Sequence, residues 1–333
     1  MNILPAVTSI LSANELGEFI KLAYNLNESF TCKLIKTGMN HTYIISNNKT
    51  KYVVRVYSHN WRLNSEIIEE VNLLKLLKEN GIGISFPIAD KKGVFIQQVK
   101  APEGLRQVVV FSFAEGGKIR FMDKGICYSF GSLMASIHNV TANKNLDRVN
   151  YNLDTLLGAS YNCSKTFFPE KLKEMAFIKE QSAAIRKCFI ENDKNLSQGI
   201  VHLDIWYDNM NITEKNEITI FDFDFCGNGP LILDVAYFCI QLFHIETDKT
   251  EYELKLKSFL EGYKNSKTLS KSELELIPSA ASAIWIFYLG IQVKRFDWSN
   301  VFLSENYLKM YVGRMKSWIE YNSKHKISID GAM

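Results

Sequence analysis

A short stretch of the chain, residues 201–225, holds the polar residues best suited to chemistry. His202, Asp204 and Asn209 have the spacing His-x-Asp-x-x-x-x-Asn, and a later apolar run ends at Asp222. Phosphoryl transfer from a nucleotide needs a carboxylate that orients the attacking hydroxyl and accepts its proton. It also needs oxygen ligands that hold a divalent cation on the phosphates. Asp204 can supply the carboxylate, and Asn209 and Asp222 carry the hard oxygens that Mg²⁺ prefers.

The spacing of these residues allows their side chains to meet. The loop between Asp204 and Asn209 is long enough for both side chains to turn toward one centre. The strand expected before Asp222 brings Asp222 alongside them, and Asp224 follows two positions later. We therefore expect Asp204 to be the catalytic base and Asn209, Asp222 and Asp224 to be magnesium ligands. His202 belongs to the same catalytic group, where we expect it to brace the loop by hydrogen bonding.

The same residues also have a purely structural interpretation. Asp and Asn are common in turns, so Asp208 and Asn209 can be turn residues. Asp222 and Asp224 can be solvent-facing positions of an edge strand, since alternate residues share a face. Three fixed positions match by chance in roughly one chain in a hundred of this length. The second element at the right distance, in an apolar strand context, favours the functional interpretation.

The first part of the chain is predicted to be rich in strands. Ser12 and Glu15 form a capping-box pattern that begins a helix. Short alternating runs joined by polar turns favour an antiparallel meander. The expected elements are a helix over 12–26, strands at 31–36, 42–46 and 51–57, a helix over 65–80, and strands at 93–99 and 105–113.

The paired glycines of the segment 114–118 mark the best linker, because they free the backbone. We place the domain boundary there, with a β-rich nucleotide-binding lobe over 1–113 and a helical catalytic and substrate lobe over 114–333. Apart from the strand-rich island at 200–225, the second lobe is expected to be helical. Its predicted helices include an apolar face at 126–137 and runs near 170–194, 231–245, 250–262, 272–293 and 303–323. The expected fold class is α+β.

Composition narrows the class of protein. The net charge is only +3 and no block of Lys or Arg occurs, so a nucleic-acid partner is not implied. The start of the chain has no basic residue before its apolar stretch and is interrupted by Pro5, unlike a secretory signal. The apolar run 280–293 is short for a membrane span. Six scattered cysteines fit reduced thiols. We expect a cytoplasmic protein with no membrane partner, a monomer or a homodimer.

Residues 200–236 contain two linked motifs, HLDIWYDN and IFDFD, followed by Gly229-Pro230 and by Asp234. In this order they resemble the aminoglycoside phosphotransferase, choline kinase and homoserine kinase superfamily. That superfamily also includes fructosamine kinases and bacterial kinases of the stress-response type. The resemblance extends over nearly the whole chain and is sharpest in this segment.

The resemblance implies a two-lobed protein-kinase-like fold, with ATP as the phosphate donor and Mg²⁺ as the cofactor. It makes Asp204 the catalytic aspartate and makes Asn209 and Asp222 the magnesium ligands. Asp234 is then expected to cap the helix that begins near it. His138, on the helix before the catalytic loop, is expected to be a packing residue.

The resemblance also assigns nucleotide contacts in the first lobe. Gly38 and Asn40 lie between two predicted strands, where the family has its phosphate-covering turn. The turn has one glycine, so an ordinary hairpin is the alternative. Arg55 occupies the place of the family's strand lysine. Arginine can still bind phosphate oxygens, and do so in a bidentate manner.

Two further elements complete the nucleotide site that the resemblance implies. Glu70 matches the helix glutamate expected to pair with the strand cation, and Glu66 and Glu69 are competitors on the same helix. The hinge is expected at 111–114. There Ser112 and Ala114 are the expected adenine contacts, through backbone hydrogen bonds that depend little on side-chain identity.

The acceptor hydroxyl is less well defined by the sequence. Residues 231–333 contain 13 Lys and Arg against 12 Asp and Glu, which argues against a polycationic aminoglycoside. An aromatic cage can hold an ammonium group by cation–π contact, although large aromatic residues are more often core residues. Lys294 and Arg295 can engage a substrate carboxylate. The aromatic candidates are Trp285, Tyr288, Trp298, Tyr307, Tyr311 and Trp318.

We therefore expect a kinase that phosphorylates a hydroxyl of a small amino-acid-like or amino-alcohol metabolite. The alternatives are a fructosamine or aminoglycoside kinase, a protein Ser/Thr kinase, and a nucleotide-binding pseudokinase. Trp206, two residues after Asp204, matches an Asp-x-Trp arrangement of fructosamine kinases. Leu203 stands where many family members have glycine. The pseudokinase is supported only by Arg55, and the intact Asp204 argues against it.

Overall fold

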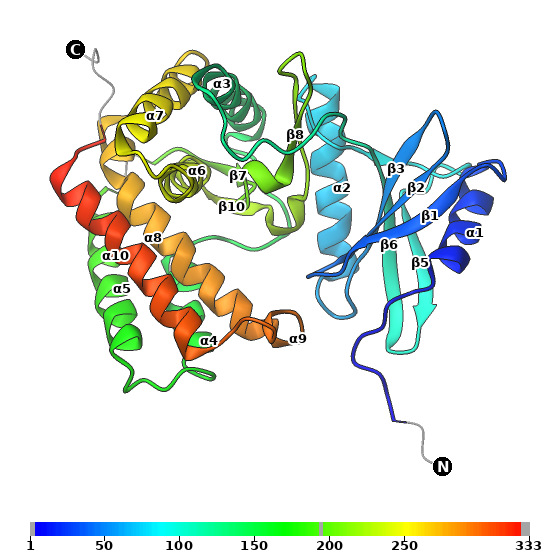
Figure 1. Cartoon of the computed structure of the whole chain (residues 1–333), viewed down its shortest axis with the longest axis horizontal. Helices are drawn as coiled ribbons and strands as arrows, with labels where there is room; N and C mark the ends of the chain where they lie inside the picture. The colour runs from blue at the N-terminus through cyan, green and yellow to red at the C-terminus, as the bar shows by residue number, and fades with distance from the viewer. Residues whose placement is uncertain (1–3, 193–195, 328–333) are drawn as a thin grey trace. The chain divides into compact units, whose positions relative to one another are not determined.

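The computed structural model describes residues 4–192 and 196–327 (Figure 1). These residues form two compact units, Met1–Glu115 and Gly116–Met333, hereafter the first and the second unit. The ends of the predicted domains at 1–3 and 328–333, and the last residues of the helix predicted over 170–194, lie outside the described residues. The α+β class is confirmed, because the first unit contains an antiparallel sheet and the second is mainly helical.

The first unit is built on a six-stranded antiparallel sheet with the order β1-β2-β3-β6-β4, in which β5 also pairs with β6. The two predicted helices and the three-stranded meander are confirmed. The strand predicted at 93–99 begins later, because Asp90 accepts hydrogen bonds from the backbone of Lys92 and Val94 and holds a turn there. The elements are α1 (Ala13–Tyr24), β1 (Thr31–Lys36), β2 (His41–Ser46), β3 (Lys51–Val56), α2 (Asn64–Glu79), β4 (Pro87–Ile88), β5 (Ile96–Ala101) and β6 (Gly104–Ser112).

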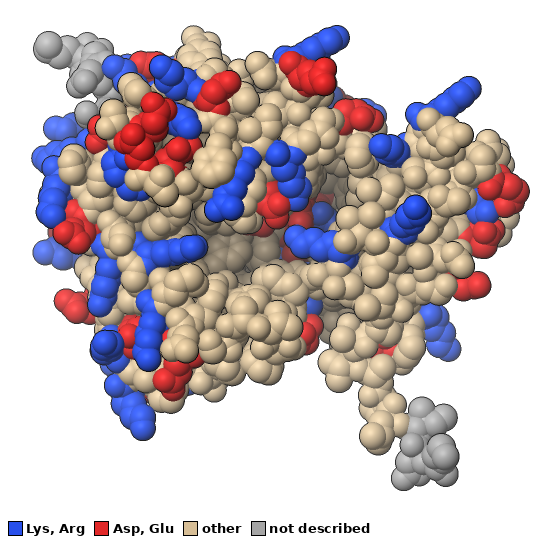
Figure 2. Space-filling view, in the orientation of Figure 1, with Lys and Arg blue, Asp and Glu red and all other residues tan. Residues whose placement is uncertain are grey.

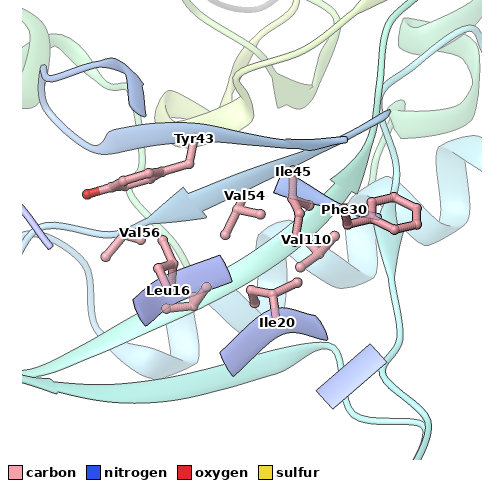
Figure 3. Close-up of a cluster of buried hydrophobic side chains, with 9 residues drawn as sticks. Leu16, Ile20, Phe30, Tyr43, Ile45, Val54, Val56 and Val110 are labelled. Atoms are coloured by element: carbon pink, nitrogen blue, oxygen red, sulfur yellow. The ribbon is translucent and has the colours of Figure 1, made fainter. Parts of the chain in front are cut away.

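The core of the first unit lies between α1 and one face of the sheet (Figure 3). Ser12 caps α1 by accepting a hydrogen bond from the Glu15 backbone. Leu16 and Ile20 of the helix then point toward the apolar side chains of β2, β3 and β6. Burial of each such side chain contributes about 1.5–3 kcal/mol to folding. The opposite face of the sheet is therefore left for α2 and the charged residues described below.

The second unit contains the predicted helices. Between α3 and α5 it also has the short π-helix η1 and the short helix α4, which were not predicted, since residues 154–164 lack a hydrophobic period. Helix α8 is long and apolar enough to cross a membrane by length and composition, but most of it is buried within the unit, where it packs on α4, α5 and α6. The elements are α3 (Lys124–Thr141), η1 (Asp154–Ala159), α4 (Ser160–Ser164), α5 (Lys173–Asn192), α6 (Ile232–Ile245), α7 (Lys249–Lys264), α8 (Lys271–Lys294), α9 (Phe296–Ser299) and α10 (Glu305–Lys324).

Two small antiparallel ladders position the chemistry-bearing residues. Strand β7 (Gln198–Val201) pairs with β10 (Gly227–Pro230) and ends directly before His202. Strand β8 (Met210–Ile212) pairs with β9 (Ile218–Ile220), which ends just before Asp222. The loop that contains Asp204 thus runs from one ladder to the other. The short turns η3 (Tyr207–Asn209) and η4 (Phe223–Phe225) complete it.

The surface charge is mixed on the face shown in Figure 2, where Lys and Arg are interspersed with Asp and Glu. This pattern agrees with the small net charge of +3. All six cysteines are free thiols, and burial raises the pKa of Cys32 to about 11 and of Cys127 to about 12. These two thiols therefore stay protonated at neutral pH.

Candidate active site

The carboxylate of Asp204 is held by neutral donors from different elements. The amide nitrogen of Asn209 donates to Asp204 Oδ2 at 2.7 Å and to the Asp204 carbonyl oxygen at 2.9 Å. The hydroxyl of Tyr237 donates to Asp204 Oδ1 at 3.0 Å. Burial, and next the nearby charge of Asp222, raise the pKa of Asp204 to about 7. The structure thus brings together Asp204, Asn209 and Asp222, as the spacing predicts.

Asn209 and Asp222 present oxygens suited to a magnesium ion. The Asn209 amide nitrogen is committed to Asp204, and within residues 4–192 and 196–327 its Oδ1 accepts no hydrogen bond. Asp222 follows β9 with φ 66°, a left-handed conformation that costs a non-glycine residue about 1–2 kcal/mol. Such local strain is typical of functional sites. One carboxylate and one amide oxygen fit Mg²⁺, which usually binds one or two protein ligands together with substrate phosphates.

Asp224 lies on the turn η4, is buried, and accepts a hydrogen bond at its backbone carbonyl from Arg148. In the described part of the chain, no three His, Cys, Asp or Glu side chains form a group that could hold a metal ion. Asp204, Asp222 and Asp224 therefore do not form an all-protein metal cage. The role of Asp224 as a ligand remains a prediction.

His202 connects the catalytic loop to β9. Its Nδ1 accepts a hydrogen bond from the Asp204 backbone at 3.2 Å, and its Nε2 lies 3.1 Å from the carbonyl oxygen of Phe221. Burial lowers the pKa of His202, so the ring is neutral and Nε2 is the donor. These contacts are those of a bracing residue, and they reach the backbone of Asp204, not its carboxylate.

Asp234 holds the backbone of the catalytic loop, a role that differs from the predicted helix cap. It lies in the first turn of α6 and accepts hydrogen bonds from the backbone N–H groups of His202 at 2.8 Å and Leu203 at 2.7 Å. Leu203 has φ 64°, a left-handed conformation. Glycine adopts this conformation without strain, which explains why glycine suits this position in the family. The prediction that Asp234 caps α6 is therefore wrong, because its oxygens are occupied by the loop.

His138 belongs to the same buried hydrogen-bond network. Its Nε2 lies 3.2 Å from Asp234 Oδ2, and its Nδ1 lies 2.7 Å from the hydroxyl of Tyr263. The prediction of a packing residue is incomplete, because this ring also connects α3 to α6 and α7. No pattern in the sequence pointed to its partner Tyr263, which lies far along the chain.

The aromatic residues of the second unit divide into core residues and residues near the loop. Trp318 is buried and donates its Nε1–H to the carbonyl oxygen of Pro278, so it is a core residue. Tyr311 is buried and donates to the carbonyl oxygen of Trp285 at 2.7 Å. Only Tyr288 of the predicted set hydrogen-bonds the loop in the described structure, at the Leu203 carbonyl oxygen (3.3 Å).

Two predicted substrate contacts near the end of α8 have other neighbours. Arg295 forms a two-point ion pair with Asp297, with Nε–Oδ1 at 2.9 Å and Nη2–Oδ2 at 3.0 Å. A carboxylate-binding role for Arg295 therefore competes with an ion pair inside the chain. Lys294 is exposed at the last turn of the helix.

Arg55 and Glu70 form the ion pair that the family resemblance predicts. Arg55 Nη1 lies 3.1 Å from Glu70 Oε1, and the Tyr57 hydroxyl donates to Glu70 Oε2 at 3.1 Å. Glu70 is fully buried and Arg55 nearly so. The competitor Glu66 instead accepts from the Leu63 backbone at 2.8 Å at the start of α2. The nucleotide contact of Arg55 itself remains a prediction.

Two other predicted nucleotide contacts, Asn40 and Ser112, form hydrogen bonds within the first unit. Asn40 Oδ1 accepts from the Ser58 backbone at 3.1 Å and ties the turn after Gly38 to the segment after β3. Ser112 donates its N–H to the Phe86 carbonyl oxygen at 2.9 Å, so this N–H is already used. Its carbonyl oxygen accepts from a serine hydroxyl as well. Ala114 is buried, and its adenine contact in the predicted hinge remains a prediction.

Tyr237 was missed in the sequence, although a signal existed. It follows Asp234 at a spacing of three on α6, so both side chains lie on one face of the helix. Once Asp234 is placed at the loop, a donor three residues later must also lie near it.

Comparison with known proteins places the chain in a family. The model of the phosphotransferase enzyme family matches residues 31–267, well over half of the chain. The homoserine kinase of Bradyrhizobium diazoefficiens is 24% identical over 300 residues, which cover 89% of this chain and 88% of that protein.

Solved structures agree on the fold. A microcompartment-associated aminopropanol kinase has a TM-score of 0.74 and 16% identity, and the match covers 95% of this chain and 99% of that one. An amicoumacin kinase, solved with AMP-PNP, Ca²⁺ and Ami, also has a TM-score of 0.74, with 19% identity and 94% of each chain covered. The expected kinase-like fold is confirmed. The chain therefore belongs to the phosphotransferase enzyme family, as a kinase with an alcohol group as its phosphate acceptor.

Proposed function

We propose that this kinase transfers the γ-phosphoryl group of ATP, bound as its Mg²⁺ complex, to a hydroxyl of a small amino-acid-like or amino-alcohol metabolite in the cytoplasm. The observation that carries the proposal is the Asp204 carboxylate, held by Asn209 and Tyr237 beside the oxygens of Asp222 and Asn209. A carboxylate so placed can orient an acceptor hydroxyl and take its proton.

The residues of the second unit divide the work as follows. Asp204 binds the acceptor hydroxyl and accepts its proton as the new O–P bond forms and the bond to the leaving ADP breaks. Asn209 Oδ1 and the Asp222 carboxylate would hold Mg²⁺, which would supply positive charge to neutralise the phosphates. His202 and Asp234 keep the loop backbone in place through the hydrogen bonds at Asp204, Leu203 and β9.

The acceptor class is supported by the surroundings of Asp204 and by the relatives. The Asp204 carboxylate, whose pKa is raised by burial and next by the charge of Asp222, is an anionic group that an acceptor with an amino group can approach favourably. The curated relatives include homoserine kinases, and the solved neighbours include an aminopropanol kinase. The ion pair of Arg295 with Asp297 favours the amino alcohol over the amino acid.

The proposal is tested by ADP release with Mg-ATP across a panel of acceptors. The panel contains 1-amino-2-propanol, homoserine, ethanolamine, choline, fructosamine and an aminoglycoside. We expect acceptor-dependent ADP release with the amino alcohol or homoserine, and a rate at least about 100-fold lower in Asp204→Asn. Asp154→Asn is the matched control, because Asp154 is exposed and pairs with Arg186 at the surface.

Nucleotide binding separates the ways in which the proposal can fail. Asp204→Asn that binds Mg-ATP as the parent does but transfers no phosphate supports the assignment. ADP release by Asp204→Asn at the parental rate contradicts it. A parent protein that binds Mg-ATP but is silent with the whole panel contradicts the proposed acceptor class, and one that binds no nucleotide contradicts the kinase assignment.

A further inference from the structure

Two tyrosines from different helices meet at the catalytic loop of the second unit. Tyr237 lies on α6 and Tyr288 on α8, and their rings stack with centroids 5.7 Å apart and planes at 26°. The Tyr237 hydroxyl donates to Asp204 Oδ1 at 3.0 Å. The Tyr288 hydroxyl donates to the Leu203 carbonyl oxygen at 3.3 Å and also lies within hydrogen-bond reach of the Asp204 side chain. The two hydroxyls thus contact Leu203 and Asp204, the residue proposed as the base.

The hydrogen bonds fix how the Asp204 carboxylate is turned. An ionised carboxylate has about four lone-pair positions, and its terminal torsion is soft. Asn209 occupies a position on Oδ2 at 2.7 Å, and Tyr237 occupies a position on Oδ1 at 3.0 Å. One donor on each oxygen stops the group from rotating about its Cβ–Cγ bond. The remaining lone pairs then face defined directions.

Helix α6 holds the catalytic aspartate at two points. Asp234 accepts from the loop backbone at His202 and Leu203. Tyr237, almost one helical turn later and 5% exposed, holds the Asp204 side chain. Because both contacts start from one buried helix, the loop backbone and the base side chain are fixed in the same frame.

We propose that Tyr237, supported by the stacked Tyr288, is a positioning residue that sets the rotation of the Asp204 carboxylate and so directs one lone pair at the acceptor hydroxyl. This inference rests on the proposed role of Asp204 as the base. Tyr237 acts through Asp204 and touches neither phosphate nor acceptor in this role. Its hydroxyl is therefore needed for the rate of transfer, while nucleotide affinity does not depend on it.

A purely structural role of the same hydroxyl makes a different prediction. A buried tyrosine that only fills space and satisfies its O–H contributes to stability, and its loss lowers the melting temperature without a specific effect on kcat. The matched control is Tyr43→Phe in the first unit. Tyr43 is fully buried and its hydroxyl donates to the Leu11 carbonyl oxygen at 2.9 Å, so the same atom is removed from a comparable hydrogen bond.

The experiment measures kcat, the KM of ATP and of the acceptor, and the melting temperature for the full chain and for Tyr237→Phe, Tyr43→Phe, Asp204→Asn and the double variant Asp204→Asn/Tyr237→Phe. We expect Tyr237→Phe to lower kcat about 10- to 100-fold with the KM of ATP within about twofold, the size of effect expected for a misplaced catalytic group. Tyr43→Phe keeps kcat within about twofold of the parent. In the Asp204→Asn background, Tyr237→Phe has no further effect on kcat.

The slow hydrolysis of ATP, in which water replaces the acceptor, is measured on the same proteins. This second assay distinguishes failure of the positioning role of Tyr237 from failure of the proposed acceptor class. Tyr237→Phe with parental kcat, or with a loss equal to that in Tyr43→Phe, overturns the positioning role. An additional loss in the Asp204→Asn background overturns it as well. If no acceptor of the panel is used, the proposed acceptor class is wrong, and the comparison of Tyr237→Phe with the parent is read from hydrolysis. A parent that releases ADP in neither assay contradicts both.

Discussion

Each unit contains a carboxylate that accepts a hydrogen bond from a tyrosine hydroxyl, but the second partner of the carboxylate differs. In the first unit, Glu70 is held by the Tyr57 hydroxyl and by the Arg55 guanidinium at 3.1 Å each. In the second unit, Asp204 is held by the Tyr237 hydroxyl and by the neutral amide of Asn209. The negative charge of Glu70 faces a cation, whereas in the described part of the chain the Asp204 carboxylate is hydrogen-bonded by neutral groups alone.

The charge of Glu70 is stabilised by its ion pair, whereas the charged form of Asp204 is electrostatically unfavourable in the folded protein. Burial and the charge of Asp222 raise the pKa of Asp204 to about 7, whereas Glu70 lies against its own counter-ion. A group that is costly to keep ionised is a common feature of catalytic sites, where stability is exchanged for activity. Substitutions at four positions can break or sharpen this comparison.

The largest loss of stability is expected at Asp234, whose carboxylate accepts hydrogen bonds from backbone N–H groups. Asp234→Ala leaves the N–H groups of His202 and Leu203 without their acceptor, and each unsatisfied group costs about 1–3 kcal/mol. We expect the free energy of unfolding to fall by about 4 kcal/mol and the rate of ADP release to fall with it. Urea unfolding measures the first effect. Asp234→Asn, which keeps one acceptor oxygen, should lose about half as much, and equal losses in the two variants would contradict this reading.

The second effect concerns the matched pair of the first unit. Glu70→Gln keeps the shape of the side chain but removes the charge that faces Arg55. Breaking a buried ion pair on one side costs about 3 kcal/mol. The melting temperature is therefore expected to fall clearly. A melting temperature within about a degree of that of the parent, from an equally cooperative transition, would mean that the ion pair contributes little to stability.

The third effect has the opposite sign and uses the same chemical change. Asp204→Asn removes a charge that, within residues 4–192 and 196–327, is hydrogen-bonded only by neutral groups. We expect the metal-free variant to be more stable than the parent by about 1 kcal/mol at neutral pH. Thermal unfolding in the presence of a chelator measures it. If carboxylate-to-amide changes at Glu70 and Asp204 shift stability in the same direction, the contrast between the two units is wrong.

The smallest effect tests the strained backbone before the base. Leu203 is fully buried and has φ 64°. Leu203→Ala and Leu203→Gly both empty its apolar site, which costs about 3 kcal/mol. Only alanine keeps a Cβ in the left-handed region, so we expect the glycine variant to be more stable than the alanine variant by about 0.5–1 kcal/mol. A more stable alanine variant would show that the φ value stores no strain.

Local patterns in the sequence were sufficient for most of the fold. The alternation and polar turns of β1 to β3 depend on neighbours along the chain, and these strands lie where they were predicted. Of the capping box predicted for α1, the structure gives the hydrogen bond from the Glu15 backbone to Ser12. The spacing of Asp204, Asn209 and Asp222 was sufficient to bring these residues together, because two short ladders fix the loop ends.

Contacts between distant residues were not predictable in the same way. The hydrogen bonds from the loop backbone to Asp234 and from Tyr237 to Asp204 join positions about thirty residues apart. The local pattern gives only the shared helix face of Asp234 and Tyr237, and not their contacts with the distant loop. The use of the Ser112 N–H by Phe86 depends on β4, a strand of two residues that leaves almost no sequence signal. The left-handed Leu203 could be suspected only because glycine is common at that position in the family.

The decisive measurement is the single-turnover transfer of label from [γ-³³P]ATP to 1-amino-2-propanol and to homoserine, by the parent protein and by Asp204→Asn at equal nucleotide occupancy. We expect the parent to form a labelled phosphoester with at least one of these acceptors. Asp204→Asn should form it at least about 100-fold more slowly while its affinity for Mg-ATP stays within about threefold of the parent. Label transfer at the same rate in both proteins would contradict the assignment of Asp204 as the base.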